Sequence, residues 1–114
     1  MAATPKIRNK PITKAACWAH ARRKFTDCQQ LAPRPCADAL ELIGRLFAVE
    51  KQAKERALSH ADRLALRQQR SLAVMEQLHQ KLLAWKGQML PKHPFAQAVG
   101  YCLNQWEALR MLLS

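Results

Sequence analysis

Acidic residues and long apolar runs are both scarce in this 114-residue sequence. The chain has 8 Asp and Glu against 19 Lys and Arg, which gives a formal net charge of +11. A surplus of this size favours a polyanionic partner over a small-molecule substrate. Nucleic acid is the first candidate, and an anionic membrane surface is the second. No apolar run approaches the roughly 20 residues that cross a bilayer, and no signal-peptide core is present. We therefore expect a cytoplasmic protein with no membrane segment.

The positive charge is concentrated at the start of the chain. Seven cations precede the first acid, Asp27: Lys6, Arg8, Lys10, Lys14, Arg22, Arg23 and Lys24. Residues 1–11 also carry two prolines and little to bury, so we expect a flexible basic arm there. Residues 12–114 are enough for one domain with a modest core, and no more.

No β-hairpin signal, internal repeat or low-complexity segment interrupts residues 12–114. Residues 12–18 fit either a short strand or the start of a helix, and a helix is expected from Ala19 to about Leu31. The prolines of "APRPC" then break the chain, and a second helix is expected from near Cys36 to about Leu58.

Two further helices follow from capping signals. Ser59 stands three residues before Asp62, the spacing of a helix N-cap, and that third helix runs close to Leu90 unless Gly87 ends it sooner. Pro94 suits the first position of a fourth helix, where its missing N–H costs nothing. These apolar positions recur at three- and four-residue steps: Leu40, Ile43, Leu46, Phe47 and Val49 or Ala53; Leu64, Leu72, Met75, Leu78, Leu82 and Trp85; and Phe95, Val99, Cys102, Leu103, Trp106, Leu109 and Leu113. The short loops predict an all-α antiparallel bundle of three to four helices.

The stretch "CWAHARRKF" places Cys17 three residues before His20, a plausible half of a zinc site. No second pair at ligand spacing exists, so a structural role for both residues is the preferred interpretation. A Cys–His nucleophilic pair would need an orienting third group and an oxyanion site as well. Without a secretion signal, all four cysteines are expected to be thiols, mostly buried as small apolar residues.

The run "ARRKF" has two interpretations. Its adjacent cations can grip phosphates while Phe25 anchors the helix in the core, or they form an ordinary solvated helix face. The tryptophans, Trp18, Trp85 and Trp106, fit the core better than base stacking.

The stretch "PITKAACWAHARRKF" closely resembles a segment of the transposases of insertion-sequence family sixty-six. The likeness continues through "ALELIGRLFAVEKQ", "ERALSHADRLALRQQRS" and "LPKHPFAQAVGYCLNQWEALRMLL", about Pro11 to Leu113 in one register. These bacterial enzymes are DDE transposases, and the resemblance implies a ribonuclease H-like catalytic fold with two aspartates and a glutamate that bind two divalent ions, such as Mg²⁺. Cys17 and His20 match the family signature, and the helices after them correspond to an insertion within that fold.

The resemblance also implies what this sequence lacks. Both family aspartates belong upstream of Pro11, and the glutamate belongs in a motif just after Ser114; Glu107 lies in the preceding helix and is not that glutamate. We therefore expect a truncated transposase that needs no cofactor of its own and is inactive alone. Its expected partners are DNA or other transposase chains, with no membrane and no small-molecule substrate. Weak, non-specific DNA binding is expected through Lys10, Lys14, Arg22, Arg23 and Lys24, and the alternative is a small basic helical protein that pairs with full-length transposase or with itself.

Overall fold

The computed structural model describes residues 14–113, and it describes side chains from Cys17 onward. Every regular element in this range is helical. The expected basic arm (residues 1–11) and residues 12 and 13 lie outside the described range. The elements are α2 (Lys14–Asp27), α3 (Pro33–Glu55), α4 (His60–Leu66), the π-helical turn η1 (Arg67–Ser71), α5 (Leu72–Trp85), α6 (Pro94–Asn104), α7 (Trp106–Arg110) and the 3₁₀ turn η2 (Met111–Leu113).

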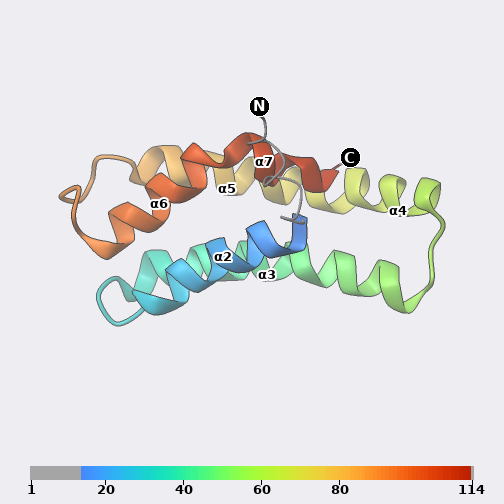
Figure 1. Cartoon of the computed structure of the whole chain (residues 1–114), viewed down its shortest axis with the longest axis horizontal. Coiled ribbons are helices and arrows are strands. Elements are labelled where there is room, and N and C mark those ends of the chain that lie inside the picture. The colour runs from blue at the N-terminus through green and yellow to red at the C-terminus, as the bar shows by residue number, and fades with distance from the viewer. Residues whose placement is uncertain (1–13, 114) are drawn as a thin grey trace, which may run out of the picture.

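These elements form four antiparallel columns, which confirms the predicted all-α bundle. The third column is α4, η1 and α5 in direct succession, and the fourth is α6, α7 and η2. The α2–α3 and α5–α6 connections lie at one end of the bundle, while the α3–α4 connection lies at the other (Figure 1). α2 packs on α3 and α6, and α5 packs on the same two helices. No helix within residues 14–113 is long and apolar enough to cross a membrane.

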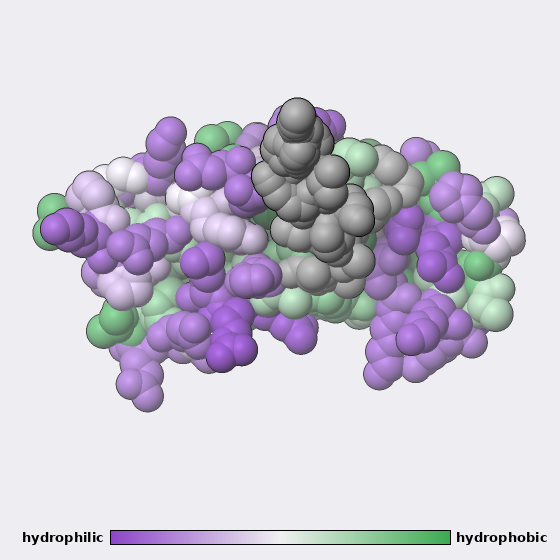
Figure 2. All heavy atoms as spheres, viewed as in Figure 1, coloured by the Kyte–Doolittle hydropathy of each residue, from purple (hydrophilic) through white to green (hydrophobic). Residues whose placement is uncertain are grey.

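The columns differ in length, so the bundle has two unequal halves. α3 and the α4–η1–α5 column extend beyond α2 and α7 as a two-helix projection (Figure 1). The main core lies where all four columns meet, and its largest fully buried side chains include Trp18, Phe25, Ile43, Leu78 and Phe95. Figure 2 shows hydrophilic side chains over most of the described part of the face that carries α2 and α6.

The first two predicted helices have the wrong boundaries. α2 begins by Lys14 and ends at Asp27, short of Leu31, because the chain folds into a tight turn in which the Leu31 and Ala32 N–H groups both donate to the Cys28 carbonyl at 3.1 Å. α3 begins at Pro33 instead of near Cys36. Both prolines of "APRPC" fit its first turn, where backbone N–H groups have no partner within the helix.

The end of α3 is a Schellman motif. The helix ends at Glu55 and not at Leu58, since Ala57 adopts a left-handed φ of 52°. The N–H of Leu58 donates to the Ala53 carbonyl at 3.1 Å, and the N–H of Ala57 donates to that of Lys54 at 3.0 Å. The chain reverses here and enters α4.

The capping predictions are confirmed. The Ser59 hydroxyl accepts from the Asp62 N–H at 3.1 Å, and Pro94 occupies the first turn of α6. The third column ends at Trp85, well before Leu90, and Gly87 follows with a φ of +83° that favours glycine.

Two features inside the last two columns were not predicted. The π-turn η1 interrupts the third column, with a Leu72 N–H bonded to the carbonyl five residues earlier, and Gln105 separates α6 from α7. Ser71 takes the inward position, so Leu72, predicted to lie on the apolar stripe, is 40% exposed.

Candidate nucleic-acid interface

Helix α2 has one buried and one exposed face. Buried residues recur at steps of three and four, the period that keeps side chains on one side of a helix: Trp18, Ala21, Phe25 and, just past the helix, Cys28. His20, Arg22, Arg23 and Lys24 fall between them and are exposed. The packing of "CWAHARRKF" therefore presents its three cations to solvent.

The buried face of α2 is held by aromatic contacts with the fourth column. The Trp18 Nε1–H donates to the Leu109 carbonyl at 3.1 Å, and the Trp18 ring meets Trp106 edge-on at 6.3 Å between centroids. Phe25 lies 5.7 Å from Phe95. Burial of Trp18 and Trp106 confirms that these two belong to the core; Trp85 is only half-buried, edge-on to Phe95 at 5.2 Å.

The three cations of α2 diverge. The Arg22 guanidinium lies 4.4 Å from the centroid of Phe47 on α3, while the Lys24 ammonium lies 4.9 Å from that of Tyr101 on α6. Arg23 forms a long, exposed ion pair with Asp27 at 3.9 Å. Exposed cation–π contacts contribute about 0.5–1 kcal/mol, and exposed ion pairs less than about 1 kcal/mol. The charges are thus loosely held and spread across the outer face of α2.

The predicted DNA-binding set is only partly described by the structure. Lys10 lies outside the described residues, and Lys14 is placed by its backbone in the first turn of α2. Arg22, Arg23 and Lys24 share the outer surface of one helix but do not converge on a single point. Their arrangement suits contacts to successive phosphates better than it suits one chelated anion.

The signature residues Cys17 and His20 lie apart from any cluster of ligands. Cys17 is half-buried against the core, and the exposed His20 ring lies 6.4 Å from Tyr101. Within residues 17–113, no three His, Cys, Asp or Glu side chains come together in a way that could hold a metal ion.

The other three cysteines are buried thiols, as predicted. Cys28 and Cys36 face each other with their sulfurs 3.2 Å apart across the α2–α3 turn. Burial, reinforced by the Cys28 thiol, raises the pKa of Cys36 to about 12, and burial raises the pKa of Cys102 to about 12. Because metal binding and nucleophilic attack both require the thiolate, Cys36 and Cys102 are poorly suited to either at neutral pH.

The carboxylates of the described range are dispersed in separate ion pairs. Glu107 is exposed and pairs with Arg110 at 3.4 Å, Glu41 pairs with Arg45 at 2.8 Å, and Glu50 pairs with a buried arginine of η1. The two-metal chemistry of the family needs carboxylates that converge on a shared pair of ions. The described residues do not fit such a centre.

The sequence interpretation missed a second cationic surface, between α3 and the η1–α5 segment. Arg45 and Arg70 approach there from opposite helices around a groove of about 220 Å³. On α3, Arg45, Val49 and Gln52 follow one another at steps of four and three, the spacing of a helix edge. This spacing was the available signal, although it does not identify which helix lies opposite.

The fold and these surfaces define a class of protein: a basic, all-helical module without a catalytic centre among its described residues. The family model described as "Transposase IS66 family" matches residues 2–114. The chain belongs to this transposase family, as the motif resemblance implied.

Three relatives from Sinorhizobium fredii (strain NBRC 101917 / NGR234) match nearly the whole chain. Uncharacterized protein y4jD is 38% identical over 109 residues, which cover 95% of this chain and 21% of the relative. Uncharacterized proteins y4hP and y4qI are 34% and 33% identical, and the matches cover 90% and 93% of this chain. The chain thus spans about a fifth of the length of these relatives. No solved structure gives a significant match.

Proposed function

We propose that this chain acts in DNA transposition as a DNA-contacting, non-catalytic part of an IS66-family transposase. The family match over residues 2–114 supports the link to transposition. The observation that carries DNA contact is the two-sided α2, which is anchored in the core by Trp18 and Phe25 and exposes three adjacent cations. A bacterial cytoplasm, where the chromosome lies, is the corresponding location.

The proposed contact is electrostatic and independent of sequence. Phosphate contacts by Arg and Lys release condensed counterions, so affinity falls steeply with salt. The dissociation constant is expected in or above the range of about 10⁻⁴ to 10⁻⁶ M that is typical of non-specific binding at physiological salt. DNA recognition of particular sites would then belong to other parts of the transposase.

The chain is not expected to cut or join DNA by itself. The resemblance assigns the catalytic carboxylates to segments outside Pro11–Leu113, and the acids of the described range are dispersed in separate ion pairs. Purified protein mixed with supercoiled plasmid and Mg²⁺ or Mn²⁺ should leave the plasmid intact. Metal-dependent nicking that co-purifies with the chain and disappears in Glu107→Gln would show that a ligand had been misassigned.

Fluorescence anisotropy with a labelled duplex tests the DNA-binding proposal. Replacing Arg22, Arg23 and Lys24 together by Ala should lower the slope of log K against log salt by roughly 0.9 for each phosphate that these cations no longer neutralise. The control replaces three other exposed cations, Lys54, Lys86 and Lys92, by Ala, because this removes the same net charge. Equal reductions in both variants would reduce the effect to net charge and contradict a specific role for α2.

A second candidate function is pairing with a transposase chain or with a second copy of this one. Leu72 and Leu83 are 40% and 47% exposed on α5, and their spacing of eleven residues places them on the same side of the helix. Light scattering coupled to gel filtration tests self-association. A dimer that Leu83→Glu converts to monomer, and that Leu83→Gln weakens less, would favour this candidate.

A further inference from the structure

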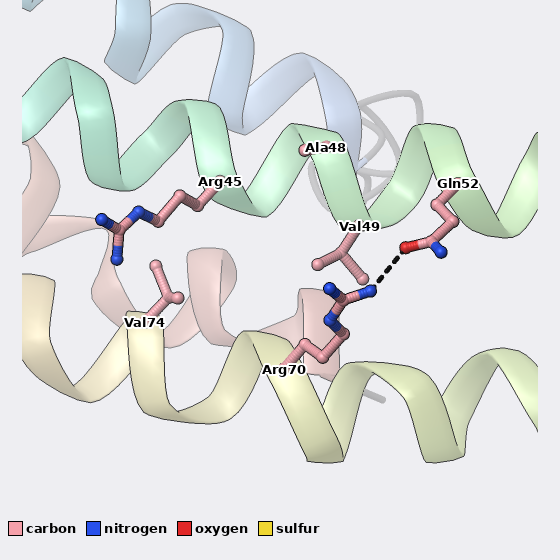
Figure 3. A pocket seen from close by; sticks show the side chains of 6 residues that line it. All are labelled: Arg45, Ala48, Val49, Gln52, Arg70 and Val74. Atoms are coloured by element: carbon pink, nitrogen blue, oxygen red, sulfur yellow. Dashed lines mark hydrogen bonds between the residues drawn. The ribbon is translucent and has the colours of Figure 1, made fainter.

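A groove runs along the outer side of the seam between α3 and the η1–α5 segment (Figure 3). Its walls are Arg45, Ala48, Val49 and Gln52 from α3, with Arg70 and Val74 from the opposite column. In Figure 3 the ribbon of α2 lies behind α3, so the groove opens on the side of α3 away from α2. It is therefore separate from the three cations of α2.

The groove is cationic, and none of its walls carries a carboxylate. Arg70 donates to the neutral side-chain oxygen of Gln52 at 2.6 Å, an interaction that does not offset its charge. Arg45 pairs with Glu41, outside the groove, through one N–H at 2.8 Å. Each guanidinium has five N–H donors, so both retain donors for an anion. Figure 3 shows the two side chains reaching into the gap between the helices from opposite sides.

The neighbouring arginine of the same turn shows that not every cation of this seam is available. Arg67 is buried and binds Glu50 through two hydrogen bonds of 2.8 and 2.9 Å, which offset its charge inside the seam. Arg70, three residues later, is exposed and meets only a neutral amide at this distance. The seam therefore has one neutralised arginine within it and one accessible arginine at its outer edge.

We propose that this groove binds a phosphodiester of DNA, with Arg45 and Arg70 donating to its oxygens from the two sides. The apolar side chains of Val49 and Val74 form the floor, where they suit contact with an adjoining deoxyribose. A guanidinium matches a phosphate in shape and charge, and two of them around a hollow of about 220 Å³ can share one phosphate group. The inference rests on the proposed function and adds a DNA-contacting surface on the other side of α3.

Charge removal tests the groove directly. The variant Arg45→Gln/Arg70→Gln keeps side-chain length and polarity, and its control, Arg34→Gln/Lys92→Gln, removes two exposed cations elsewhere. Binding of the full chain to a labelled duplex is measured by anisotropy from about 50 to 300 mM KCl. The groove variant should bind about tenfold more weakly, as expected when a hydrogen bond to a charged group is removed, and its salt slope should fall by about 0.9 more than that of the control.

A second pair of variants keeps both arginines in place. Val74→Glu puts a carboxylate beside the two guanidiniums, where it occupies them and repels phosphate, whereas Val74→Gln has nearly the same size without the charge. Val74→Glu should weaken DNA binding about as much as the double arginine variant does, and Val74→Gln should weaken it much less. Circular dichroism confirms that each variant is folded before binding is compared.

The outcomes separate the inference from the proposed function. If the unaltered chain does not bind DNA at low salt, both are overturned. If it binds, and the α2 triple variant loses affinity while the groove variants behave like their controls, the groove proposal is overturned and the proposed function stands. Weaker binding in Arg45→Gln/Arg70→Gln and Val74→Glu, but not in the controls, establishes the groove as a DNA-binding surface.

Discussion

Ala57 offers a stability test whose sign depends on one backbone angle. It follows the end of α3 with a φ of 52°, a left-handed conformation that costs a non-glycine residue roughly 1–2 kcal/mol. Glycine adopts this conformation without that cost, but its more flexible unfolded chain offsets the gain by about 0.4–1 kcal/mol. We therefore expect Ala57→Gly to raise the free energy of unfolding by about 0.5–1 kcal/mol and Tm by about 2 to 8 °C.

A matched control lies in the same two-helix projection. Ala65 is exposed in the interior of the continuous α4–η1–α5 column, where glycine is disfavoured by about 0.8–1.0 kcal/mol relative to alanine. The same chemical change should therefore have opposite effects at two sites eight residues apart. Urea unfolding followed by circular dichroism at 222 nm measures both variants against the parent chain.

The result that would refute this reasoning is a loss of stability in Ala57→Gly comparable to that in Ala65→Gly. It would mean that Ala57 is not left-handed in solution and that the Schellman bonds to the Ala53 and Lys54 carbonyls do not form. A stabilised Ala57→Gly alongside a destabilised Ala65→Gly would instead support the reversal between α3 and α4 on which the geometry of the groove depends.

Two further perturbations probe the buried polar and thiol groups. Glu50→Gln and Arg67→Met should each destabilise the fold by about 2–3 kcal/mol, below the usual 3–5 for a buried pair because the Glu50 side chain is 25% exposed; a double-mutant cycle should give a coupling of about 1–3 kcal/mol, and additive effects would contradict the pairing. Because burial raises the pKa values of Cys36 and Cys102 from 9.0 to about 12, the unfolded chain releases these protons first, so unfolding free energy should fall between pH 9 and 12 by up to about 1.4 kcal/mol per pH unit per thiol. Urea unfolding across this range should show a shallower decline in Cys36→Ala/Cys102→Ala, and an identical decline would rule out the thiols as its cause.

Periodicity and capping chemistry predicted most of the helical architecture because both are local. The Ser59 cap needs only an acceptor three residues before the Asp62 N–H, and Pro94 needs only a missing donor in a first turn. The same local reasoning failed at Pro33 and Pro35. Prolines interrupt a helix interior but are tolerated in a first turn, and the sequence alone does not indicate which of these positions they occupy.

The unpredicted features depend on interactions between segments distant in the sequence. The π-turn places Arg67 against Glu50, seventeen residues earlier, and no local signal identifies that partner. The groove likewise requires Arg45 and Arg70 to face each other across two helices, which depends on the register of α3 against α5. Helical patterns specify which face of each helix is apolar, but not which residues of two helices end up opposite each other.

The motif "CWAHARRKF" shows how far the requirements of folding account for its residues. Trp18, Ala21 and Phe25 are almost fully buried, so packing alone restricts these positions. The outer positions are different: Arg22 and Lys24 cover the rings of Phe47 and Tyr101, interactions worth about 0.5–1 kcal/mol each. Alanine's high helix propensity would offset part of their removal, so the fold itself has little need for three adjacent charges. If the triple alanine variant keeps its helicity and loses DNA affinity, the cations of this motif serve binding, while its apolar residues serve the fold.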